Sequence, residues 1–356
     1  MPSPSSSTSV LTFELDGTSS NTFTLTDATG QVLRTLQQTG FASGEQGDGA
    51  GLLLFGSHTF DQALAMIARD GTVAPIPSSV IGVIPPGATL LDSHRVLASV
   101  GDQNHAKLDL IDLTTGQVST LLTVVATQQT GGLQPQSLVQ LSTSADRSVA
   151  HVLVRHATVN GTSVPQWAVV DVDLARNVVS IRHVPVANGV DPYDALEPAL
   201  SNDGRLLAYE EGTTPDAQGN ADYRTHMVDL ASGHDTVIDH MPLAVSIDSR
   251  GLRLSPDGSV LVAYGYTWPS TGQSFTMTAF ATANGHLLSR IDAGNALNNS
   301  IEPVGWIGNH TLAYTTNTSA TGNFNGSTSV AHTFDAISGE RYDLPAGVGL
   351  LVAVLN

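Results

Sequence analysis

A strand-turn-strand pattern that occurs in at least two copies constrains the fold of this chain most. Residues 252–264 read LRLSPDGSVLVAY, and residues 198–209 read PALSNDGRLLAY. Each copy places apolar and β-branched residues on both sides of an Asp-Gly pair, which is typical of two antiparallel strands joined by a tight turn. A unit this small cannot bury its own apolar faces, so we expect neighbouring copies to pack against one another.

A second pattern predicts a hairpin, with an aspartate four residues before the turn residue. This aspartate is Asp112, Asp173, Asp229 or Asp335, and weaker copies without it surround positions 30, 71 and 285. The seven turn residues stand at positions 30, 71, 116, 177, 233, 285 and 339, which gives spacings of 41 to 61 residues. Such spacings are in the range of propeller blades with variable loops.

The two ends of the chain complement each other. A pair of inner strands precedes the later hairpins, at residues 138–154, 198–209, 252–264 and 303–314. The first repeat has three strands within residues 10–36, and residues 347–355 supply one apolar strand without a hairpin. Pairing that last strand with the first three would remove the free sheet edges. The sequence therefore predicts an all-β, seven-bladed β-propeller closed by the C-terminal strand pairing with the N-terminal blade.

The predicted domain organisation is simple. Residues 10–356 form a single β-propeller domain, and residues 1–9, MPSPSSSTS, form a disordered Ser/Pro-rich leader. Residues 63–68, ALAMIA, precede an Arg-Asp-Gly turn and are interpreted as the first strand of a hairpin. Residues 47–51, Gly-Asp-Gly-Ala-Gly, are interpreted as a flexible loop.

The turns at Ser201 and Ser255 carry a resemblance to a known repeat. SNDG and SPDG are each followed by a small apolar strand and then by a hairpin, the first reading MVDLASG. This arrangement resembles the TolB-type, WD40-like (PD40) β-propeller repeat, well over residues 138–344 and weakly over residues 10–133. The resemblance implies a fold and no single function, because similar repeats occur in periplasmic scaffolds, peptidase propellers and polysaccharide lyases.

The composition excludes several classes of function. The chain has 32 acidic and 14 basic residues and a formal net charge of -18. Nucleic acid is excluded as a partner because phosphate binding needs clustered lysine and arginine. The charge serves solubility or attracts a cationic partner or divalent ion. The absence of cysteine excludes disulfides, thiolate catalysis and cysteine-based metal sites. No apolar run reaches the roughly 18 residues of a transmembrane segment.

A repeat allows functional candidates to be found by subtraction. Aspartates that recur in register, in the turns and hairpins, are interpreted as structural because they accept backbone hydrogen bonds. The residues left over are carboxylates and aromatic residues of the loops, where propellers bind ligands. One pair of these carboxylates could hold Ca²⁺ or Mg²⁺, or act as general acid and base. The predicted ligand-binding residues are Asp191, Tyr193, Asp194, Glu197, Glu302 and Trp268, and the predicted metal ligands are Glu197 and Glu302.

No catalytic motif accompanies these residues. The sequence contains no HExxH, no G-x-S-x-G and no P-loop. A lyase of the resembling class would need a histidine cluster at the channel, and the spacing of the 12 histidines does not assign one. The catalytic residues therefore stay unknown, and the sequence favours a protein that is not an enzyme.

These observations lead to one hypothesis and two rivals. The first is a non-catalytic, envelope-associated, monomeric propeller without a cofactor, which binds a protein, peptide or glycan at its channel mouth. The Ser/Pro-rich leader resembles the spacer of a bacterial lipoprotein, which predicts a periplasmic or extracellular, lipid-anchored protein. The first rival is a metal-assisted lyase or hydrolase acting on an extracellular polysaccharide or lactone. The second is a structural module of a larger assembly.

Overall fold

The structure is a computed structural model in which every regular element of the described residues is a β-strand. It describes residues 9–15, 21–27, 31–38, 41–42, 46–55, 63–68, 70–78, 80, 84–85, 88–102, 104–127, 138–185, 198–212, 223–241, 251–267, 274–295, 299–318, 328–344 and 350–355. Across these residues we find no helix that is long and apolar enough to cross a membrane.

Two sheets contain the beginning of the chain, and one of them also contains its end. The first has the strand order β3-β2-β1-β29-β5 and the second the order β4-β6-β7-β8. The last strand pairs with β1 in antiparallel fashion. The strands are β1 (Ser9–Leu15), β2 (Asn21–Asp27), β3 (Val32–Gln38), β29 (Leu350–Leu355), β5 (Gln46–Gly49), β4 (Phe41–Ala42), β6 (Gly51–Phe55), β7 (Ala63–Ala68) and β8 (Val73–Pro75).

The middle of the chain forms one sheet of eight strands. Its main path is β16-β15-β14-β12-β11-β10-β9, and β13 pairs with β14 beside that path. The strands are β9 (Thr89–Leu90), β10 (Arg95–Gly101), β11 (His105–Asp112), β12 (Val118–Ala126), β13 (Leu138–Thr143), β14 (Val149–Val159), β15 (Thr162–Asp173) and β16 (Val178–His183).

Three sheets of four antiparallel strands follow, each in simple chain order. The first contains β17 (Ala199–Leu200), β18 (Leu206–Gly212), β19 (Tyr223–Asp229) and β20 (Asp235–Met241). The second contains β21 (Gly251–Leu254), β22 (Val260–Thr267), β23 (Ser274–Ala281) and β24 (Leu287–Asn295). The third contains β25 (Asn299–Ile307), β26 (Thr311–Thr318), β27 (Thr328–Asp335) and β28 (Arg341–Asp343).

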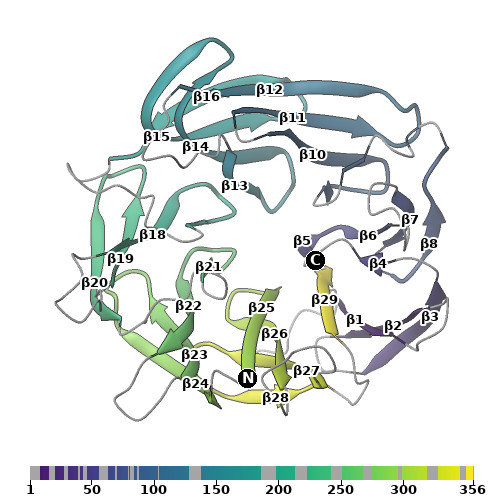
Figure 1. Cartoon of the computed structure of the whole chain (residues 1–356), viewed down its shortest axis with the longest axis vertical. Helices are drawn as coiled ribbons and strands as arrows, with labels where there is room; N and C mark the ends of the chain where they lie inside the picture. Colours follow the sequence, from purple (N-terminus) through teal and green to yellow (C-terminus); the bar gives the residue numbers. More distant parts are fainter. Residues whose placement is uncertain are drawn as a thin grey trace.

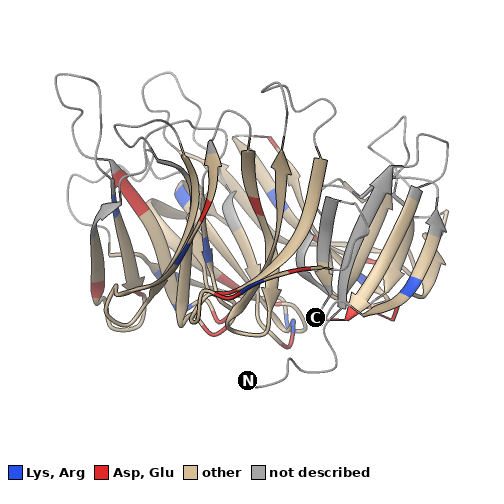
Figure 2. Ribbon diagram, turned by 90° about the horizontal axis from the view of Figure 1, so that it is seen from below, with Lys and Arg blue, Asp and Glu red and all other residues tan. Residues whose placement is uncertain are grey.

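The sheets follow one another around a common axis, with β21 and β25 on the inner side and β20, β24 and β28 on the outer side (Figure 1). Figure 2 shows the described turns gathered at its lower side. We call that side the turn face. The opposite side, at which β18, β22 and β26 end, is the loop face. The seven predicted hairpins are confirmed, because the strands on either side of each turn residue pair in antiparallel fashion.

The Ser-x-Asp turns of the turn face have nearly identical hydrogen bonds. In the turn that begins at Ser255, the serine Oγ donates to Asp257 at 2.8 Å and accepts from the Val260 N–H at 2.9 Å. The corresponding distances are 2.6 and 2.9 Å in the turn that begins at Ser201, and 2.7 and 3.0 Å in the turn that begins at Ser144. The structural role predicted for the turn aspartates is thus confirmed. Gly258 has φ +69°, which explains the glycine that follows the aspartate.

The hairpin aspartates also have the structural role that the sequence predicts. The carboxylate of Asp229 accepts hydrogen bonds from the N–H groups of Ala231 and Ser232, both at 2.9 Å. Equivalent pairs of bonds, of 2.7 to 3.0 Å, are made by Asp112, Asp173 and Asp335. An aspartate that satisfies two N–H groups of its own turn fixes the hairpin locally.

The apolar core is divided among the interfaces between neighbouring sheets. Trp167 of β15 packs with Leu207 and Tyr209 of β18. Trp306 of β25 packs with residues of β22 and β23, including Tyr264. Both tryptophans are buried between sheets. Because strand residues alternate between two faces, each four-stranded sheet is apolar on both sides and needs a neighbour on each.

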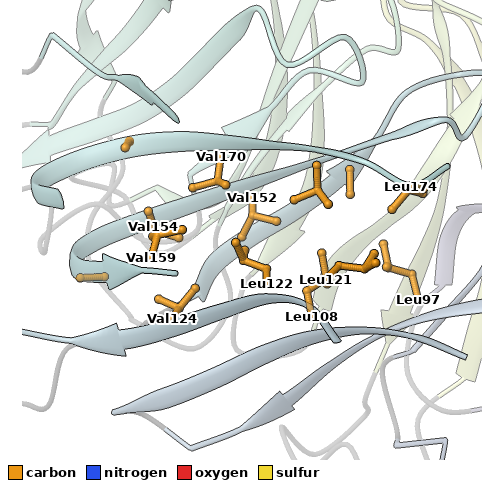
Figure 3. Close-up of a cluster of buried hydrophobic side chains, with 14 of the residues drawn as sticks. Leu97, Leu108, Leu121, Leu122, Val124, Val152, Val154, Val159, Val170 and Leu174 are labelled. Carbon is orange, nitrogen blue, oxygen red and sulfur yellow. The ribbon is translucent and has the colours of Figure 1, made fainter. Parts of the chain in front are cut away.

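The eight-stranded sheet arises because one long hairpin reaches across to the preceding hairpin. Residues 157–159 of β14 pair with residues 124–126 of β12, just after a bulge at His156, which has φ +41°. The tip of the hairpin fixes this contact, since the Asn160 Oδ1 accepts from the Thr123 N–H at 2.9 Å and from the Thr123 Oγ at 3.1 Å. The long hairpin therefore covers the outer edge of β12, and a buried apolar cluster lies beneath the joint (Figure 3).

Two expectations from the sequence need correction. Residues 47–51 are not a flexible loop, because residues 46–49 form β5, which pairs in parallel with β29, and β6 begins at Gly51. The innermost strand of the last sheet begins at Asn299 rather than at Pro303, so that Glu302 lies within a strand. Most of the predicted leader, residues 1–8, lies outside the described residues, and Ser9 is already part of β1.

Candidate functional site

Most of the predicted binding residues lie outside the part of the chain that the structure describes. These are Asp191, Tyr193, Asp194, Glu197 and Trp268. The strands before and after the first four, β16 and β17, end and begin on the loop face, as the topology of the neighbouring sheets requires. Of the predicted binding residues, the structure describes Glu302 alone.

Glu302 lies on the innermost strand of the last sheet. It is half-buried and pairs with Thr315 of β26, which in turn pairs with Ala331 of β27. Ala331 packs against Val354 of β29, so the Glu302 side chain belongs to the side of its sheet that faces β29. Its carboxylate has no hydrogen-bond or ion-pair partner within the described ranges.

A short chain of polar side chains lies on the same side of the sheet as Glu302, nearer to the loop face. The Asn317 Nδ2 donates to the Ser300 Oγ at 3.3 Å, and the Ser329 Oγ donates to the Asn317 Oδ1 at 2.6 Å. Both Ser300 and Asn317 are buried. This part of the interface between the first and last sheets is thus polar, in contrast to the apolar cluster nearer the turn face.

Two buried histidines occupy equivalent positions in the sheets β17–β20 and β25–β28. His226 pairs with Tyr209, and His332 pairs with Tyr314. In both pairs the imidazole stacks on the tyrosine ring, with centroids 4.9 and 5.0 Å apart. These residues were not among those predicted from the sequence. A signal was present, because each histidine stands three residues before a hairpin aspartate and each tyrosine follows Leu-Ala.

His226 lies between two carboxylates. Its Nδ1 is 2.8 Å from Asp235 Oδ2, and its Nε2 is 3.0 Å from Glu211 Oε2. An ionised carboxylate only accepts hydrogen bonds, so both contacts are hydrogen bonds only when the ring carries both protons. Burial and the two carboxylates raise the pKa of Tyr209 to about 12, and the phenol stays neutral. This arrangement is suited to an ion pair that joins three strands of one sheet.

His332 has different neighbours. Its Nδ1 is 2.8 Å from Asp343 Oδ1, and its Nε2 is 2.7 Å from Thr316 Oγ1. The Arg341 Nη2 lies against the ring, 3.2 and 3.1 Å from the two ring nitrogens. Burial, assisted by the Arg341 charge, lowers the pKa of His332 below the ordinary value of 6.5, although Asp343 opposes this shift. The imidazole is therefore neutral at physiological pH.

An arginine and an aromatic ring of the preceding sheet face each of these histidine clusters. Arg155 lies 5.8 Å from the ring centroid of Trp167, in the interface that also contains Tyr209. Arg253 lies 5.8 Å from the ring centroid of Tyr264, in the interface that contains Tyr314. In the described residues neither tyrosine hydroxyl, of Tyr209 or of Tyr314, has a hydrogen-bond partner. These two interfaces are thus polar over the half nearer the loop face.

The described residues contain no group of three or more histidine, aspartate or glutamate side chains arranged to hold a metal ion. The predicted ligand pair of Glu197 and Glu302 is tested at neither position, because Glu197 lies outside the described ranges.

No protein-family model matches the chain, and no curated protein matches it. Among solved structures, it is similar to a putative 6-phosphogluconolactonase from Bacteroides fragilis, with 14% identity, 99% of each chain covered and a TM-score of 0.54. It is also similar to a hypothetical selenium-binding protein from Sulfolobus tokodaii, with 10% identity, 99% of this chain and 94% of that chain covered and a TM-score of 0.51. TolB from Acinetobacter baumannii aligns with 12% identity over 98% of this chain and 82% of that chain, with a TM-score of 0.40. These likenesses concern the fold alone, which is an all-β propeller.

Proposed function

We propose that this protein is a binding propeller that holds a protein, peptide or glycan on its loop face, beside the innermost strands. One observation carries the proposal. Glu302 has a half-buried carboxylate on an innermost strand, and no described residue donates a hydrogen bond to this carboxylate or forms an ion pair with it. The hairpin aspartates differ from it in this respect, because their carboxylates accept hydrogen bonds within their own turns.

The energetics of a half-buried carboxylate favour a cationic group on the ligand. Removing a charge from water is unfavourable unless a partner compensates it. A lysine or arginine side chain of the ligand would supply that partner at Glu302. The net charge of -18 would attract such a ligand from a distance. We therefore favour a protein or peptide over a neutral glycan.

The proposal also includes the closure of the ring. The eight-stranded sheet contains two of the predicted hairpins, so it counts as two blades and brings the number of blades to seven. The pairing of β29 with β1 would then close the ring and place the C-terminal strand opposite Glu302. A crystal structure with another number of blades, or with β29 detached from β1, would remove this part of the proposal.

Binding to peptide and glycan arrays tests the proposed function. We expect the full chain to retain lysine- and arginine-containing peptides and to release them at high salt. The E302Q variant should bind at least about tenfold more weakly, by roughly 1.4 kcal/mol, at an unchanged melting temperature. E340Q is the matched control, because Glu340 is exposed on the turn face of the same sheet. Equal binding by E302Q and the wild type would refute the role of Glu302, and no binding to either array would refute the function.

The rival function, a metal-assisted lyase or hydrolase, and the envelope location remain predictions from the sequence. Calcium or magnesium should raise the melting temperature of the wild type and not of E302Q if Glu302 binds a metal. The native upstream sequence and cell fractionation would test the lipid-anchored, periplasmic or extracellular location.

A further inference from the structure

We propose that Thr316, His332 and Asp343 form a nucleophilic site that accepts the acyl group of a small ester. The three side chains lie on the adjacent strands β26, β27 and β28. The proposal is independent of the ligand proposed for Glu302, which faces the opposite side of the same sheet. No motif in the sequence assigns such a site, because its members come together only through strand pairing.

The hydrogen bonds fix the direction in which a proton can move. The Asp343 carboxylate only accepts, so the His332 Nδ1, 2.8 Å away, carries the proton. In a neutral ring the Nε2 is then an acceptor, and the Thr316 hydroxyl, 2.7 Å away, must donate to it. A hydroxyl that donates to an imidazole, which in turn donates to a carboxylate, is the arrangement that activates a hydroxyl nucleophile.

The equivalent histidine provides an internal comparison. When the two sheets are aligned on their Tyr-His pairs, Glu211 in the sheet β17–β20 occupies the position of Thr316, two residues after the stacked tyrosine. In the same alignment Asp235 occupies the position of Arg341. The stacked Tyr-His pair recurs and is thus explained by the repeat. The hydroxyl on Nε2 occurs only in the last of these two sheets, so the repeat does not account for it.

The surroundings keep the His332 ring neutral, which is the form in which Nε2 can accept a proton. The titratable and charged groups that face it are Asp343 and Arg341 on β28 and Tyr314 on β26, and Arg253 and Tyr264 belong to the neighbouring sheet in the same interface. Burial and Arg341 favour the neutral ring. Arg341 also brings a positive charge to the cluster, which suits the oxyanion of a tetrahedral intermediate.

The nucleophile is accessible although its base is not. His332 is 2% exposed, whereas Thr316 is partly exposed and lies two residues before the loop-face end of β26. Its neighbour across the strand pair, Val330, is 38% exposed. An open apolar side chain beside the hydroxyl suits a short acyl chain.

The reaction balances without any redox partner or metal. The Thr316 Oγ forms a bond to the ester carbonyl carbon while His332 Nε2 takes the hydroxyl proton. The bond from that carbon to the leaving oxygen then breaks, and the alcohol departs with the proton from His332. A water molecule releases the carboxylic acid from the threonine ester, with His332 again as the base. Asp343 is a positioning residue, because it holds the ring in the tautomer that exposes the Nε2 lone pair.

Acylation by p-nitrophenyl acetate, followed by intact mass and peptide mapping, tests the proposal. The wild type should gain one acetyl group on Thr316 and release p-nitrophenol. T316V and H332Q should acylate at least about 100-fold more slowly, the loss typical of removing a nucleophile or a base. T316S should retain the reaction and thus separates loss of the hydroxyl from misfolding. D343N should react more slowly and lose activity at a lower pH, because Asp343 favours the protonated ring.

Two variants serve as matched controls. Thr318 lies on the same strand and its hydroxyl donates to Asn299 at 3.0 Å, so T318V should react like the wild type. H226Q removes the equivalent histidine of the other sheet and should also react like the wild type. If the wild type gains no acetyl group on Thr316, or if T316V reacts as fast as the wild type, the three residues only support the sheet and the proposal is wrong.

Discussion

Replacing Ser255 with alanine removes the centre of one Ser-x-Asp turn. The fully buried Ser255 hydroxyl accepts from the Val260 N–H at 2.9 Å and donates to Asp257 at 2.8 Å. A buried N–H without an acceptor costs about 1 to 3 kcal/mol. Asp257 loses less, because Ser259 still donates to it from its N–H and its hydroxyl, at 3.0 and 2.7 Å. We therefore expect S255A to lower the free energy of unfolding by about 2 to 4 kcal/mol.

The same substitution at Ser144 is the matched control. Its hydroxyl makes equivalent bonds of 2.7 and 3.0 Å, but the residue is only half-buried. Water can replace the lost hydroxyl there, so S144A should cost about 1 kcal/mol. Urea unfolding measures both values, and hydrogen exchange of the Val260 amide locates the effect. Equal losses in the two variants would show that burial does not set the cost.

Three further predictions concern pH and the joined hairpins. The Ser144 hydroxyl holds the pKa of Asp146 at about 2, and the Ser232 N–H, together with Arg205, holds the pKa of Asp229 at about 2. The two aspartates therefore stabilise the fold at pH values above the ordinary pKa of 3.8, and this stabilisation is lost as the pH falls from 3.8 towards 2. An acid titration followed by circular dichroism should show β-structure lost in this window and not above pH 5. The pKa of His332 lies below 6.5 in the folded protein, so as the pH falls this histidine is protonated in the unfolded chain first. The free energy of unfolding should therefore fall as the pH falls below 6.5, and H332Q should remove this part of the pH dependence of the urea midpoint. Asn160 has φ +44° and accepts a hydrogen bond from the Thr123 N–H. N160A should lower the free energy of unfolding by about 1 to 2 kcal/mol and speed hydrogen exchange of the Thr123 and Thr127 amides. N160G should lower it less, because glycine relieves the backbone strain at this position.

The parts of the fold that could be predicted from the sequence are those fixed by local contacts. Asp229 satisfies two amides within its own turn, and Ser255 ties together residues no more than five positions apart. Such contacts leave a readable spacing in the chain. The pairing of β14 with β12 depends instead on the length of one hairpin, and β5 is a short, glycine-rich segment without an alternating pattern. Neither could be predicted from periodicity.

The candidate site was predictable to a smaller extent for a related reason. Glu302 was proposed from the sequence because it is not one of the recurring aspartates, and its role in binding stays a prediction although the structure places it on an innermost strand. The histidine clusters were missed, since a carboxylate on one strand and a hydroxyl on another become neighbours only when the strand register is known. Asp343 illustrates this, because it faces His332 across a single register pair.

The joint between β12 and β14 has a mechanical consequence. Strand pairing runs without interruption through this part of the molecule, whereas in the described residues no strand pairing connects the later sheets, which meet through side chains. Under force, heat or protease, residues 89–183 should therefore open as one cooperative unit, and the first separation should occur at a boundary between the later sheets. Native-state proteolysis should accordingly release that segment as a single long-lived fragment.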